Sequence, residues 1–155
     1  MFYDMPRRDA ASILFNLPGY QVVSASRAED GHRVVLIETV STEGGCPGCG
    51  VMSSRVHSRP IQQVKDLPCG GGRLTVRVCK RRYVCAETVC ARRTFTEVTD
   101  ELPARARLIT RLAAGVVDAL RLEPRAVSGV AAQHGVSWTT AGASGYQHHR
   151  CRRAR

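Results

Sequence analysis

The sequence lacks any long apolar run. No stretch of its 155 residues is apolar enough over a sufficient length to cross a membrane. The first residues, MFYDMPRRDAAS, do not combine an apolar run with a small-residue cleavage site, so they do not resemble a secretory signal. These absences favour a cytoplasmic location and give no reason to expect a membrane partner. In that reducing compartment, seven cysteines are more typical of metal ligands or buried thiols than of disulfides.

Acidic residues are also scarce. The chain has 13 Asp and Glu residues against 23 Lys and Arg residues, and its formal net charge is +10. Residues 46–99 alone carry 10 basic and 3 acidic residues, a net charge of +7. A localised basic excess is the usual footprint of a protein that binds polyanions. The acidic residues form no pair suited to holding a catalytic metal, and no nucleophile motif is present, so we expect no enzymatic activity from this chain.

The residues that are present favour an α+β fold in four parts. Residues 1–45 contain two β-prone runs around the Asp-Gly turn signal in EDGH, which predicts a β-hairpin. Residues 46–98 predict a zinc-ribbon-like β module, with a strand in RLTVRVCKRRYVC on which Leu74, Val76 and Val78 share one face. We expect a bulge or strand end near KRR. Residues 142–155 form a basic tail that we expect to be disordered, with a free Cys151.

Residues 99–141 have a helical pattern. Apolar residues recur at steps of three and four from Leu108 to Leu120, which predicts an amphipathic helix of roughly five turns. We expect Asp100 as its N-cap, Pro103 in its first turn and Pro124 at its end. The following stretch, AVSGVAAQHGVSWTTA, is a helix-turn-helix candidate.

The cysteines suggest a metal site. Cys46 and Cys49 form a C-x2-C pair, and Cys85 and Cys90 form a C-x4-C pair after a gap of 35 residues. Two such pairs can supply the four thiolates of a structural zinc site, which leaves no open position for catalysis. The alternatives are unrelated buried cysteines or, with less support, a redox pair, since no βαβ pattern surrounds the first pair.

Two further cysteines lie between the pairs. We interpret Cys69 and Cys79 as packing residues, although either could replace one of the four proposed ligands.

Basic residues lie between and beside the cysteines, with Tyr83 and Phe95 among them. Such residues neutralise DNA phosphates, while the alternative is a solvated face. The candidate DNA-contacting residues are Arg55, His57, Arg59, Arg77, Lys80, Arg81, Arg82, Arg92 and Arg93.

The helix-turn-helix candidate has the three local features that this motif needs. Ala131 is a small residue where helices can cross, Gly135 suits the turn, and Ser137 can cap the second helix. Trp138 and Thr139 would open the recognition helix, so Ser137, Trp138 and Thr139 are also candidate DNA-binding residues.

Together these segments resemble the ISL-three family of insertion-sequence transposases. The matching residues, in order over most of residues 12–141, are CPGCG, RVHSR, DLP, RLTVRVCKRRYVC, CARRTFTE and VAAQHGVSW. The resemblance implies a zinc-finger region followed by helix-turn-helix segments that bind the terminal inverted repeats of the element. In the family, a DDE-type catalytic domain follows. This sequence ends at Arg155 and has no apolar periodicity after Ala141, so we expect a truncated or frame-shifted region without that domain.

Two functions from different classes follow. The first is binding of double-stranded DNA at transposon ends without catalysis. The alternative is a zinc-stabilised protein-interaction module that pairs with itself or with full-length transposase. Salt-dependent DNA binding separates the two.

Overall fold

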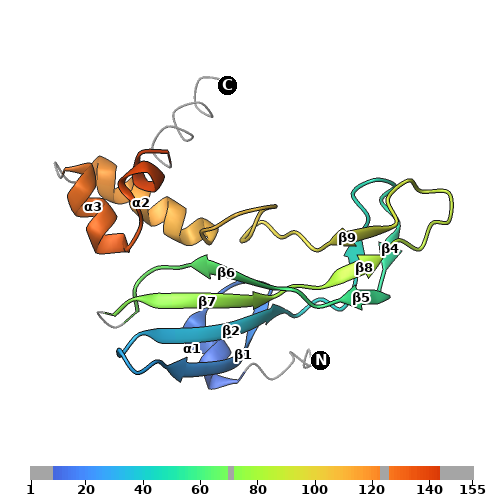
Figure 1. Ribbon diagram of the computed structural model, residues 1–155, viewed down its shortest axis with the longest axis horizontal. Coiled ribbons are helices and arrows are strands. Elements are labelled where there is room, and N and C mark those ends of the chain that lie inside the picture. The colour runs from blue at the N-terminus through green and yellow to red at the C-terminus, as the bar shows by residue number, and fades with distance from the viewer. Residues whose placement is uncertain (1–8, 70–71, 123–125, 144–155) are drawn as a thin grey trace, which may run out of the picture.

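The computed structural model describes residues 9–69, 72–122 and 126–143. In Figure 1, the larger sheet occupies the middle of the molecule, with a small β module at one end and the C-terminal helical segments at the other. The tail from residue 144, Cys151 and Pro124 lie outside the described residues. The elements are α1 Ala10–Phe15, β1 Tyr20–Arg27, β2 Arg33–Thr39, β3 Gly44–Gly45, β4 Met52–Ser53, β5 Val56–Ser58, β6 Ile61–Lys65, β7 Leu74–Cys79, β8 Arg82–Val84, β9 Thr94–Thr96, α2 Thr110–Leu122 and α3 Val127–His134. This is the α+β architecture that the sequence predicts.

The four-stranded sheet has the order β1-β2-β7-β6. Strands β1 and β2 form the predicted antiparallel hairpin, β2 and β7 run parallel, and β7 and β6 run antiparallel. The hairpin turn closes with a 2.7 Å bond from the Ala28 N–H to the His32 carbonyl. Gly31 has a φ of 79° in this turn, a conformation that glycine adopts at little cost. The Asp-Gly signal therefore marks the turn correctly.

The core of the sheet follows the alternation seen in the sequence. Leu74, Val76 and Val78 of β7 are buried, whereas Arg77 between them is exposed. They pack with residues of β1, β2 and β6 and with the short helix α1, which lies behind the sheet in Figure 1. Burial of apolar surface at about 25 cal/mol per Å² is the main stabilising contribution to such a core.

The chain leaves the sheet twice for the small β module, which consists of β3, β4, β5, β8 and β9. It leaves the sheet after β2, returns as β6, and leaves again when β7 ends at Cys79 and β8 begins at Arg82. The sheet therefore takes strands from both sides of the boundary that we expected at residue 45. The strand end expected near KRR is the point where the chain changes sheets.

The α2 helix is shorter than the sequence pattern indicates. It begins at Thr110, because Leu108 and Ile109 lie in an extended segment beside β6. The Lys65 N–H donates to the Arg107 carbonyl and the Ile109 N–H donates to the Lys65 carbonyl, both at 3.0 Å. The expectation that Asp100 is the N-cap is wrong. Its carbonyl instead accepts a 2.8 Å bond from the Thr110 hydroxyl.

An ion pair fastens α2 to the rest of the fold. Arg111 of α2 bonds the Asp66 carboxylate, with Nε at 2.8 Å from Oδ1. The same guanidinium donates to the Phe15 and Asn16 carbonyls at 2.8 and 2.9 Å, and lies 4.7 Å from the centre of the Phe15 ring. Asp66 is 3% exposed, so its carboxylate is shielded from water, whereas the Arg111 side chain is partly exposed. The ion pair with Arg111 gives Asp66, the aspartate of the DLP segment, a structural role.

A helix, a turn and a second helical segment follow α2. The α3 helix ends at Gly135, which has a φ of 64°. Helical residues resume at 138–143. The Thr140 N–H donates to the Ser137 hydroxyl at 3.2 Å, so Ser137 caps this segment as expected. Val130, Ala131 and Ala141 pack with α2 in a second apolar cluster.

Candidate metal centre and basic surface

The first cysteine pair lies on a tight turn between β3 and β4. The Gly50 N–H donates to the Cys46 carbonyl at 2.7 Å, and Gly50 has a φ of 76°. The Gly48 N–H points to the Cys46 sulfur at 3.4 Å. This arrangement turns both thiols to the same side and adds a backbone dipole that stabilises a thiolate.

The second pair lies between β8 and β9. The Cys85 N–H donates to the Arg93 carbonyl at 2.9 Å, which closes the loop that carries Cys90. This loop faces the first turn, so Cys46 Sγ lies 4.0 Å from Cys90 Sγ and Cys49 Sγ lies 3.6 Å from Cys85 Sγ.

The cluster has the geometry of a structural zinc site. The four sulfurs all lie within 4.8 Å of one another. Zinc–sulfur bonds of about 2.3 Å at the corners of a tetrahedron would place the sulfurs about 3.8 Å apart, so the positions fit. Among the residues that the structure describes, this is the only gathering of three or more potential Cys, His, Asp or Glu ligands. When bound, zinc would crosslink the two turns without supplying catalysis.

The metal-free thiols differ in acidity. Burial opposes ionisation of Cys46, but hydrogen bonds from the Gly48 and Cys49 N–H groups and from neighbouring thiols lower its pKa to about 7. The Glu87 N–H lowers the pKa of Cys85, but burial and the three other thiols outweigh it and raise that pKa to about 12. The pKa of Cys49 is also raised: the Val51 N–H and the Cys85 thiol lower it, but burial and the thiols of Cys46 and Cys90 outweigh them. The Cys46 thiolate therefore forms readily, whereas a bound divalent cation would be needed to hold Cys49 and Cys85 ionised.

Two buried aromatic side chains pack beside the metal centre. Tyr83 of β8 and Phe95 of β9 are 0% and 4% exposed, and their ring centres lie 5.6 Å apart. They form a small apolar cluster with Cys46. A Cβ atom at Gly44 would lie 3.0 Å from the Tyr83 ring, so the strand β3 approaches the ring closely only because it carries glycine there.

The two cysteines between the pairs lie away from the metal cluster. Cys79 is half-buried at the end of β7, but Cys69 is exposed, which corrects our interpretation of Cys69 as a packing residue. Its N–H donates to the Gly72 carbonyl at 3.2 Å in the connection between β6 and β7.

The small module is therefore a zinc ribbon, and comparison with known families agrees. Residues 42–90 match the family model described as the zinc-finger of transposase IS204/IS1001/IS1096/IS1165. This match and the four-cysteine cluster together support zinc as the cofactor. Comparison with curated proteins and with solved structures gives no match. In the part of the chain that the structure describes, no helix has the length and apolar character needed to cross a membrane.

The candidate DNA-contacting residues separate into two groups. Lys80 and Arg81 are only 6% and 5% exposed, so the structure does not place them on an open strip as we expected. Arg59 is exposed but lies 3.3 Å from the Glu38 carboxylate. Arg82 is exposed and donates to the Thr94 hydroxyl at 2.7 Å. The other exposed candidates are Arg55, His57, Arg77, Arg92 and Arg93.

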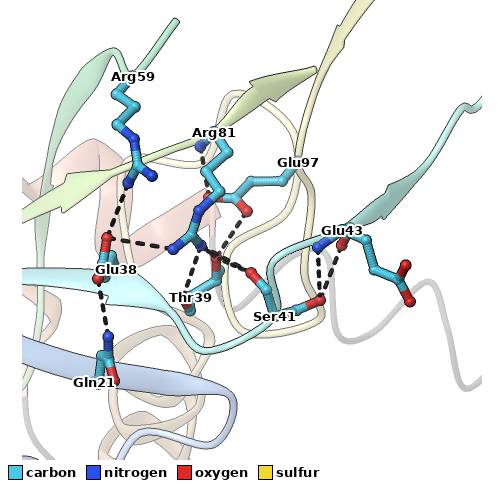
Figure 2. Close-up of polar contacts among 8 residues, drawn as sticks. All are labelled: Gln21, Glu38, Thr39, Ser41, Glu43, Arg59, Arg81 and Glu97. Atoms are coloured by element: carbon cyan, nitrogen blue, oxygen red, sulfur yellow. Dashed lines mark hydrogen bonds and ion pairs between the residues drawn. The ribbon is translucent and has the colours of Figure 1, made fainter. Parts of the chain in front are cut away.

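Arg81 bonds the zinc ribbon to the sheet. Figure 2 shows its guanidinium between Glu38, Thr39 and Ser41, which follow one another where β2 leaves the sheet. It donates to the Thr39 and Ser41 carbonyls at 2.8 and 2.9 Å and lies 3.4 Å from the Glu38 carboxylate. The Glu97 carboxylate accepts the Arg81 backbone N–H and the Thr39 hydroxyl, both at 2.8 Å. Thr39 and Ser41 lie 42 and 40 residues from Arg81 along the chain, so local sequence patterns did not reveal these partners.

The candidates of the last helical segment lie at its first turn. Trp138 is 65% exposed, and Ser137 and Thr139 are also exposed. The Ser137 hydroxyl contacts the Thr139 and Thr140 hydroxyls at 2.9 and 2.7 Å. An exposed tryptophan beside polar hydroxyl groups leaves this end of the helix available for contacts outside the chain.

Proposed function

We propose that the chain binds double-stranded DNA at transposon ends through its zinc ribbon and its last helical segment. The observation that carries this proposal is that the β module containing the transposase zinc-finger match, together with the loop that follows the match, has arginines at its surface. Those exposed arginines are Arg55, Arg82, Arg92 and Arg93. Their charge would neutralise backbone phosphates, which supplies most of the non-specific affinity of DNA-binding proteins.

Arg82 is the most informative of these residues. It lies in the central strand of the sheet β5-β8-β9, next to the buried Tyr83, so alternation directs it to the outer face. Its bond to Thr94 holds the guanidinium in a defined position on that face. Residues His57, Arg77 and Arg93 are further proposed contacts, whereas Arg81 is left out because its charge is satisfied inside the fold.

The last helical segment would contribute base recognition. Phosphate contacts position a protein on DNA, but only contacts with base edges distinguish sequences. The exposed Trp138 and Thr139 lie at the start of a helix that is capped by Ser137 and packed on α2 through Ala141. This geometry supports a recognition role for the first turn of that helix.

The test is the salt dependence of duplex binding by the zinc-loaded chain. Arg82→Gln should weaken binding to all duplexes alike and make the slope of log affinity against log salt shallower by about 0.9. Arg27→Gln is the matched control, because it removes the same charge at the end of β1 away from the zinc ribbon. Equal slopes for both variants and the original chain would contradict the proposed surface.

Base recognition has a separate test. Thr139→Ala should reduce the preference for terminal repeats over a scrambled duplex while leaving the salt slope unchanged. A preference that is unaffected would remove the helix from the interface.

A second candidate function rests on exposed apolar residues of the same module. Val51, Met52, Val56 and Val89 are 38%, 52%, 38% and 89% exposed. Such side chains favour a protein-interaction module that pairs with another copy or with transposase. Association that is insensitive to salt, together with no binding to DNA, would favour this alternative.

A further inference from the structure

A cleft of about 590 Å³ lies where the zinc ribbon, the four-stranded sheet and the segment before α2 meet. The zinc ribbon contributes Pro47 and Arg92, and the two strand ends of the sheet contribute Pro60 and Lys80. Arg105 lines it from the segment before α2. The volume is within the range of about 300–1,000 Å³ that is typical of ligand-binding clefts.

Lys80 is the main reason to expect an anion in this cleft. It is only 6% exposed, yet its ammonium makes no side-chain hydrogen bond or ion pair with any residue in the described ranges. Burial lowers the pKa of Lys80, and the nearby charge of Glu97 opposes this change. A cation that is largely withdrawn from water and has no hydrogen-bonded partner is costly, so an anion bound beside it would be stabilising.

The other charges around the cleft also favour an anion. Arg92 and Arg105 are exposed, and neither guanidinium is bonded to a residue that the structure describes. Arg105 lines the cleft and has a φ of 60°, a conformation that is uncommon for a residue with a side chain. Glu97 is the only acidic residue lining the cleft, and each of its carboxylate oxygens already accepts a hydrogen bond.

We propose that this cleft binds a phosphate group, with Lys80 at its inner wall and Arg92 and Arg105 at its rim. Phosphate oxygens accept several charge-assisted hydrogen bonds at once, and a guanidinium can donate two in parallel. Three cationic side chains from three separate segments converge here against one engaged carboxylate. The phosphate can belong to a DNA backbone or to a free phosphate compound, because both present the same chemistry.

The first arm of the test uses inorganic phosphate and the zinc-loaded full chain. Binding is followed by calorimetry at constant ionic strength, with chloride as the reference anion. Lys80→Met keeps most of the buried stem and removes the charge, so phosphate affinity should fall about tenfold or more. Arg27→Gln is the control and should leave the affinity unchanged. Equal affinities for these two variants, or no phosphate binding by the original chain, would overturn the proposal.

A second variant keeps the test decisive if Lys80→Met misfolds. Arg105→Gln changes an exposed residue and should also weaken phosphate binding several-fold. If Lys80→Met loses zinc or unfolds, Arg105→Gln decides the matter: an affinity equal to that of Arg27→Gln rejects the site.

The second arm uses duplex DNA and identifies the source of the phosphate. It rests on the proposed DNA binding, whereas the first arm does not. If the ligand is the DNA backbone, Lys80→Met should make the salt slope shallower by about 0.9 while Arg27→Gln does not. An unchanged slope with weakened binding of inorganic phosphate assigns the cleft to a free phosphate compound. Absence of duplex binding by the original chain would count against the DNA proposal alone.

Discussion

Replacing Arg81 by methionine should destabilise the fold far more than the same replacement at Arg82. The two residues are neighbours in the sequence, but the Arg81 side chain is 7% exposed and Arg82 lies on the outer face of β8. The Arg81 guanidinium holds the carbonyls of Thr39 and Ser41 and contacts Glu38 (Figure 2). Methionine would fill a similar volume without donating any of these bonds.

The magnitude follows from what the substitution leaves unpaired. Breaking a buried ion pair by removing one partner costs about 3–5 kcal/mol, and each buried acceptor left without a donor costs about 1–3 kcal/mol. Glu38 would keep its contacts with Arg59 at 3.3 Å and with Gln21 at 2.9 Å, so the lower end of the range for breaking a buried ion pair applies. We expect Arg81→Met to lower the free energy of unfolding by about 3 kcal/mol, and Arg82→Met to change it by about 0.5 kcal/mol or less.

Urea unfolding at a fixed zinc concentration measures both values. DNA binding should show the reverse order, with Arg82→Met weakening affinity at every salt concentration tested. Similar losses of stability in the two variants would refute the argument that Arg81 is a buried structural link between the zinc ribbon and the sheet.

Three further outcomes follow from the structure. Arg111→Met should lower the free energy of unfolding in urea by about 3–5 kcal/mol, because it leaves the buried Asp66 without its ion-pair partner. Arg121→Met, in the last turn of α2, should change it little. Equal losses in the two variants would contradict the stabilising role of the ion pair between Arg111 and Asp66. Zinc binding at pH 8 should release about two or more protons per metal, because the pKa of Cys85 is about 12 and that of Cys49 is raised. Zinc affinity should therefore fall as the pH is lowered. Calorimetry in two buffers counts the released protons, and no release would contradict these thiol acidities. Co-expression with an active element should lower the number of transposition events through competition for DNA ends, and no reduction at high excess would argue against binding at those ends.

Local patterns in the sequence were sufficient to predict much of the fold. The Asp-Gly turn, the alternation of Leu74, Val76 and Val78, and the two cysteine pairs each depend on residues close together in the chain. Hairpin turns, strand faces and metal-binding turns are specified at that range. The cysteine pairs also converge as the zinc-site interpretation requires.

The sequence could not show where the chain changes from one sheet to the other. Lys80 and Arg81 lie at this crossing, so both are buried although their neighbours Arg77 and Arg82 are exposed. Their environment depends on β2 and on the segment after β9, which are distant in the sequence. For the same reason, Leu108 and Ile109 fit a helical pattern but lie in an extended segment beside β6, where Ile109 is buried and Leu108 is half-buried.

Metal content tests the central claim that four cysteines hold the zinc ribbon together. Native mass spectrometry of the purified chain should give one zinc ion per molecule. Cys85→Ser should lose it, whereas Cys69→Ser should retain it, because the exposed Cys69 lies outside the cluster of sulfurs. Full zinc retention by Cys85→Ser, or a zinc-free original chain, would contradict the account.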